Sequence, residues 1–148
     1  MKNFFKGFFN KPISQEPATS NSVLLSAISL MIEVSLADEI MDISELETLK
    51  KVLLNEFEVK ENDLENLISD AKKNQNSSTS LYEFTRKIND EYEFDDKKNL
   101  ILSMWEIAFA DGNIDKYEEY VIRKVSDLIY ISHDDFIKAK LEVKNENS

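Results

Sequence analysis

The chain has 148 residues, the size of one domain and enough to bury a sizeable core. Two glycines and two prolines cannot supply the turns of a β-rich fold, and a formal net charge of −11 disfavours nucleic-acid binding. The absence of cysteine excludes disulfides and thiol chemistry, and a single histidine argues against His-based metal binding or catalysis. The composition therefore predicts an all-α protein. Without a long apolar run or a secretory signal in the sequence, we expect it to be cytoplasmic.

The first residues differ from the rest of the chain. Residues 1–11 read MKNFFKGFFNK, and residues 12–21 resemble a linker because they are polar and contain both prolines. We therefore expect an N-terminal segment with its linker over 1–21 and one helical domain over 22–148. The helical spacing of the early aromatic residues predicts one apolar side, formed by Phe4, Phe5, Phe8 and Phe9.

Two interpretations of this Phe/Lys segment remain open. It could dock a protein partner or make weak contact with an anionic membrane surface through residues 1–11, which would make the protein membrane-peripheral. It could instead fold back onto an apolar patch of its own domain, since exposed phenylalanines are an aggregation hazard.

Beyond the linker, apolar residues recur with the period of an α-helix. The pattern predicts about seven helices, near 22–37, 43–57, 61–74, 81–91, 96–110, 115–130 and 133–143. A Ser-x-x-Glu capping box at Ser80 is expected to open the fourth of them.

The chain contains an internal repeat at a shift of 73 positions. In a window of 22 positions that begins at Met31 and Met104, 8 residues are identical. Half of the identical residues are acidic: Glu33/Glu106, Asp38/Asp111, Asp42/Asp115 and Glu45/Glu118. Two related helix–acidic turn–helix units predict a bundle with a pseudo-two-fold axis, because each hairpin needs a partner to bury its apolar face.

The second copy of the repeat also carries a resemblance. Residues 110–118 read ADGNIDKYE and follow Glu106, which is similar to the Ala-Asp-Gly-x-Ile-x-x-x-Glu signature of TerB-like domains. That family includes tellurite-resistance TerB proteins and the N-terminal domain of the DjlA co-chaperones. The resemblance implies an all-helical fold and a stress or tellurite response, with divalent-cation binding and no reaction. The first copy departs from the signature, with Glu39 in place of Gly and Met41 in place of Ile.

The repeated acids have two interpretations. Carboxylates without Cys or paired His favour a hard divalent cation such as Ca²⁺, Mg²⁺ or Mn²⁺. The predicted ligands are Glu106, Asp111, Asp115 and Glu118, with Glu33, Asp38, Asp42 and Glu45 as a weaker counterpart. Alternatively, Asp42-x-x-Glu45 and Asp115-x-x-Glu118 are capping boxes that bind the first amides of a helix. The repeat does not decide, because duplication copies caps as faithfully as ligands.

The sequence predicts a protein that is not an enzyme. It contains no recognisable nucleophile, phosphate-binding glycine loop or catalytic constellation. The leading hypothesis is a module that binds a divalent cation through its acidic turns. The alternative is an adaptor that recruits a protein partner through its acidic face and the Phe/Lys segment, with the acids serving only as caps.

Overall fold

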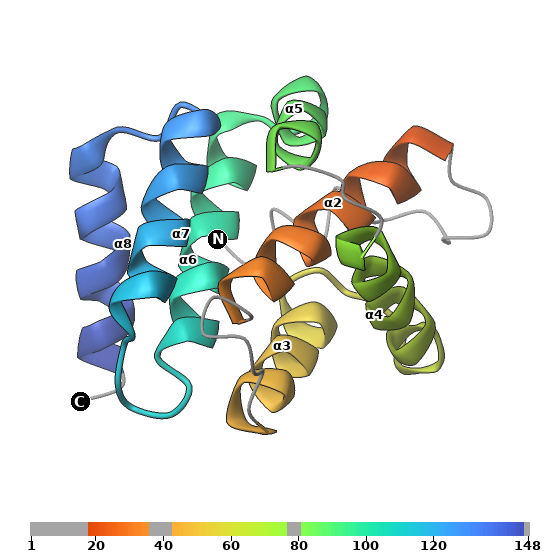
Figure 1. Ribbon diagram of the computed structural model, residues 1–148, viewed down its shortest axis with the longest axis horizontal. Helices are drawn as coiled ribbons and strands as arrows, with labels where there is room; N and C mark the ends of the chain where they lie inside the picture. Colours follow the sequence, from red (N-terminus) through yellow and green to blue (C-terminus); the bar gives the residue numbers. More distant parts are fainter. Residues whose placement is uncertain (1–17, 36–42, 77–80, 147–148) are drawn as a thin grey trace.

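The computed structural model describes residues 18–35, 43–76 and 81–146. Within these ranges the chain forms seven α-helices and no strand, which confirms the predicted fold class (Figure 1). The helices are α2 (Ala18–Ser35), α3 (Ile43–Asn55), α4 (Glu61–Asn76), α5 (Leu81–Glu91), α6 (Phe94–Ala108), α7 (Lys116–Leu128) and α8 (His133–Glu146). The predicted Phe/Lys segment with Phe4, Phe5, Phe8 and Phe9 lies outside the described residues, as do Ser80, Asp38 and Asp42.

Helices α2 and α6 occupy the centre of the arrangement. α2 contacts α4, α5, α6 and α7, whereas α6 contacts α2, α3, α7 and α8. In Figure 1, α6, α7 and α8 run side by side at one end, and α2 crosses the middle of the molecule towards α4. None of the helices in the described ranges is long and apolar enough to cross a bilayer.

The central position of these two helices follows from their sequences. From Val23 to Val34, α2 buries hydrophobic side chains on nearly every side, and α6 does the same from Leu100 to Ala108. Serines tolerate this burial in α2 where the hydroxyl can bond back to its own helix, as Ser35 does to the carbonyl of Met31 at 3.4 Å. The outer helices are amphipathic instead. In α8, for example, Phe136, Ala139 and Val143 form the buried side.

Trp105 lies at the centre of the α6–α8 contact. It is fully buried, and its ring centroid lies 5.2 Å from that of Phe136 and 6.1 Å from that of Phe109. Tilted aromatic contacts of this kind add to the free energy gained from burial alone. Trp105 therefore anchors the half of the core formed by α6, α7 and α8.

The two copies of the repeat have matching helix boundaries. At the 73-residue shift, the end of α2 falls on the end of α6, and both ends of α3 fall on the ends of α7. The chain then reverses into α4 and α8 through one residue with positive φ, Glu58 (54°) after α3 and Tyr130 (65°) after α7. Each unit is thus followed by a third helix in the same order.

Candidate cation site at the acidic turns

The second acidic turn joins α6 to α7 over residues 109–115. The amide of Gly112 donates to the carbonyl of Phe109 at 2.9 Å, and Gly112 has φ of +88°, a conformation that side-chain-bearing residues rarely adopt. A Cβ atom at this position would meet nothing within 4 Å. The turn therefore requires glycine for its backbone conformation and not for lack of space.

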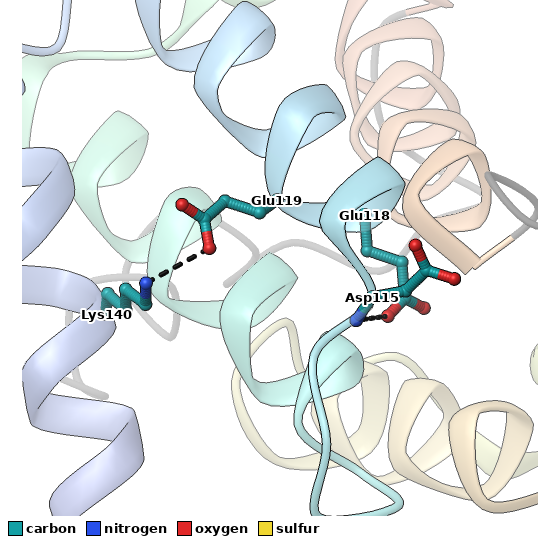
Figure 2. A network of polar contacts seen from close by, with 4 residues as sticks. All are labelled: Asp115, Glu118, Glu119 and Lys140. Carbon is teal, nitrogen blue, oxygen red and sulfur yellow. Dashed lines mark hydrogen bonds and ion pairs between the residues drawn. The ribbon is translucent and has the colours of Figure 1, made fainter.

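Asp115 and Glu118 form the capping box of α7. The amide of Tyr117 donates to Asp115 Oδ1 at 2.8 Å, and the amide of Asp115 donates to Glu118 Oε1 at 3.2 Å. Figure 2 shows Glu118 turned back beside Asp115, while the next residue, Glu119, points the other way towards Lys140 of α8. Glu118 is only 4% exposed. The capping interpretation of this pair is confirmed.

The other two predicted ligands of the second copy lie outside the capping box. Asp111 is exposed, and its Oδ1 accepts a hydrogen bond from the amide of Asn113 at 3.0 Å within the turn. Glu106 is half-buried on α6. The structure therefore brings Asp115 and Glu118 together, whereas Asp111 bonds to its own loop.

The first copy is described in part. Glu45, the counterpart of Glu118, is also 4% exposed near the start of α3. Burial raises the pKa of the Glu33 carboxyl above its ordinary value of 4.5, because a half-buried carboxylate is poorly solvated. Across the described ranges, no three His, Cys, Asp or Glu side chains gather closely enough to hold a metal ion. Because Asp38 and Asp42 lie outside those ranges, the set of eight acids is described incompletely.

Sequence reasoning missed two sets of residues. One is a buried polar group at the α5–α6 junction that includes Tyr92 and Asp96. The spacing Glu93-x-x-Asp96 could have indicated it, but Glu is not a favoured N-cap residue. The other is a row of exposed tyrosines on α7, Tyr117 and Tyr120, whose rings lie under the ammonium groups of neighbouring lysines.

The fold and the turns define a class of protein: an all-helical domain whose sequence repeats a helix–acidic turn–helix unit. The chain belongs to the TerB family, since the family model described as "Tellurite resistance protein TerB" matches residues 24–141. This confirms the resemblance seen in the ADGNIDKYE segment. Domains of this family are generally non-catalytic. Comparison with curated proteins and with solved structures gave no match.

Proposed function

We propose that this TerB-family domain is a non-catalytic module that binds a divalent cation, Ca²⁺, Mg²⁺ or Mn²⁺, with its acidic turns. The observation that carries the proposal is the repeat of four acidic pairs in register, Glu33/Glu106, Asp38/Asp111, Asp42/Asp115 and Glu45/Glu118. The half-buried Glu33 carboxyl, whose pKa is raised by burial, is consistent with it. A nearby cation would offset the cost of keeping this carboxylate ionised, and hard cations prefer carboxylate oxygens. We propose tellurite resistance as its physiological context, and this part of the proposal is supported only by the name of the family.

A pseudo-two-fold relation between the halves is part of this proposal. It is supported by part of the pattern of helix contacts, because three contacts have a counterpart when α2, α3 and α4 are exchanged with α6, α7 and α8, whereas the α6–α7 contact has no comparable counterpart within the described ranges. The α2–α7 contact then corresponds to α3–α6, the α2–α4 contact to α6–α8, and the α3–α4 contact to α7–α8. In the view of Figure 1, the start of α3 and the turn before α7 both lie towards the lower edge of the molecule. Such a relation would give the two turns equivalent surroundings.

Calorimetric titration of the full chain with Ca²⁺, Mg²⁺, Mn²⁺ and Zn²⁺ tests the proposal. We expect heat of binding with a hard cation, and about tenfold or greater weakening in Glu33→Gln and Asp111→Asn. Glu61→Gln, which changes an exposed acid on α4, is the matched control and is expected to bind as the wild type does. Absence of binding at millimolar cation, or equal binding by all four proteins, contradicts the proposal.

A second proposed function is protein docking, with the acids serving only as caps. It is supported by the Asp115–Glu118 capping box and by the two exposed tyrosines on α7, Tyr117 and Tyr120, which are 56% and 59% exposed. Lys116 lies 5.4 Å from the ring centroid of Tyr117, and Lys124 lies 5.9 Å from that of Tyr120. Tyrosine is enriched at protein interfaces because it combines apolar area with a polar tip.

The Phe/Lys segment offers a separate test of the docking function. Deletion of residues 1–12 is expected to abolish binding to a partner or to anionic vesicles while leaving the thermal midpoint nearly unchanged. A large fall in the midpoint would favour packing of the segment on its own domain. In cells, Tyr117→Ser/Tyr120→Ser is expected to reduce partner recovery, whereas the control Tyr82→Ser, at an exposed tyrosine on α5, is not.

A further inference from the structure

A buried carboxyl group lies where α5 gives way to α6. Asp96, in the first turn of α6, is 2% exposed, and its Oδ2 accepts a hydrogen bond from the amide of Glu93 at 3.2 Å. Its Oδ1 is buried without a hydrogen-bond partner in the part of the chain that the structure describes. A buried carboxylate oxygen that receives no hydrogen bond is costly when it carries charge and inexpensive when it is protonated.

No cation offsets the charge of this group within its own helical turn. Lys97 lies over the ring of Tyr130 at 5.6 Å, and Lys98 lies over the ring of Phe94 at 5.4 Å. The flanking acids Glu93 and Asp95 act on Asp96 with the same sign of charge. Further ionisable groups lie at the end of α5 (Asp90, Glu91), at the end of α7 (Asp127) and in the first turns of α8 (His133, Asp134, Asp135, Lys138). Of these, Asp135 and Lys138 line a surface pocket together with Asp95 and Lys98.

The pKa values agree with this geometry. Burial raises the pKa of Asp96 to about 6 and outweighs the hydrogen bond from Glu93, which lowers it; the charges of Glu93 and Asp95 raise it further. Burial, together with the charge of Asp96, also raises the pKa of the fully enclosed Tyr92 hydroxyl well above 10.0. The Asp96 carboxyl therefore titrates close to neutral pH and the Tyr92 phenol does not.

The junction links three helices. The side-chain Nδ2 of Asn89, near the end of α5, donates to the backbone carbonyl of Leu128 at the end of α7, at 3.0 Å. The amide of Tyr92 donates to the carbonyl of Ile88 at 2.8 Å, and the amide of Lys97 donates to that of Glu93 at 3.0 Å. Opening of residues 89–97 would admit water to the Asp96 carboxylate, so the ionised form favours the opened junction.

We propose that Asp96 is a proton-controlled latch: protonated, it holds the α5–α6 junction closed, and ionised, it loosens that junction. The sign follows from linkage, because a carboxyl whose pKa is raised by folding stabilises the closed form at low pH and loses that effect as the pH rises. With an ordinary pKa of 3.8 in the open form and about 6 in the closed form, the opening equilibrium rises about tenfold between about pH 5 and about pH 7.5.

Hydrogen exchange on the full chain tests the latch. The opening equilibria of the amides of Tyr92, Glu93 and Lys97, corrected for intrinsic exchange, are compared at about pH 5 and about pH 7.5. We expect a rise of about tenfold in the wild type and no rise in Asp96→Asn, which stays neutral and retains an oxygen for the Glu93 amide. Asp95→Asn, at an exposed acid of the same turn, is the matched control and keeps most of the rise.

Two outcomes overturn the latch: equal pH dependence in the wild type and Asp96→Asn, or its loss in Asp95→Asn alone. A direct measurement covers the case in which Asp96→Asn folds poorly. An NMR titration of the Asp96 carboxyl carbon in the wild-type chain is expected to give a pKa clearly above 5, and a value at or below the ordinary 3.8 removes the proposal.

Discussion

Lys140 of α8 places its ammonium 3.0 Å from Oε1 of Glu119 on α7, and the same ammonium lies 5.6 Å from the ring centroid of Trp105 on α6. The side chain of Lys140 thus links its own helix, α8, to both α7 and α6. Its charge is shared between a carboxylate and an aromatic face.

Removal of the Lys140 charge is expected to cost about 1 kcal/mol of unfolding free energy, because its ion pair is about 30% exposed and only partly screened by water. Urea unfolding of Lys140→Met, followed by circular dichroism at low and high salt, measures the loss. Lys50→Met is the matched control, since its partner Glu65 is 80% exposed, and its expected cost is close to zero. Equal losses in both variants would contradict the stabilising role given to the Lys140–Glu119 ion pair.

The two aspartates of the second turn, Asp115 and Asp111, are expected to differ in how much they contribute to the free energy of unfolding. Asp115→Ala removes the acceptor for the amide of Tyr117 and should destabilise the protein by about 1 kcal/mol. Asp111→Ala removes only an exposed bond within the turn and should change stability by less than about 0.5 kcal/mol. Thermal unfolding without divalent cations gives both values. A larger effect at Asp111 than at Asp115 would argue against capping as the stabilising role.

Gly112→Ala is expected to cost about 1 kcal/mol of stability, owing to the positive φ alone. Because the added methyl group meets nothing within 4 Å, we expect no rearrangement of the core. The thermal midpoint and the near-ultraviolet spectrum, respectively, test these two statements. A cost of several kcal/mol would show that the turn has a tighter packing role than the geometry indicates.

Glu33→Gln is expected to make stability less dependent on pH. The raised pKa of Glu33 means that its contribution to stability is complete at low pH and is lost as the pH rises above about 4.5. The variant should therefore gain stability relative to the wild type between about pH 4 and about pH 7 in the absence of divalent cations. Paired urea titrations at several pH values provide the measurement. If Glu33→Gln instead lost stability relative to the wild type as the pH rises, the prediction of a raised pKa for Glu33 would be wrong.

The existence and order of the helices could be predicted from the sequence because apolar residues repeat with the helical period and few glycines interrupt them. The ends were less predictable, and the reason is visible after α3 and α7. Phe57 and Ile129 are buried although their helices end at Asn55 and Leu128, so the apolar pattern continues past the end of the helix. α2 begins at Ala18 and not near residue 22, directly after Pro17.

The candidate site was predictable only in its local part. The Asp115–Glu118 pair follows from a spacing of three residues, which fixes their relation within one helical turn. The burial of Asp96 depends on how other helices pack against α6, which contacts α7 and α8, and no periodicity in one segment encodes that packing. The same holds for Lys97 over Tyr130, which are far apart in the sequence.

Trp105 is the only tryptophan of the chain and is fully buried against Phe136 of α8. Intrinsic tryptophan fluorescence therefore comes from one known place in the fold. This emission reports on the tertiary packing of the α6–α8 half, whereas far-ultraviolet dichroism reports on helices of both halves. Coincident transitions by the two methods would mean that the duplicated units melt as one cooperative body. If the fluorescence of Trp105 changed at a lower denaturant concentration than the dichroism, the α6–α8 half would unfold before the other half.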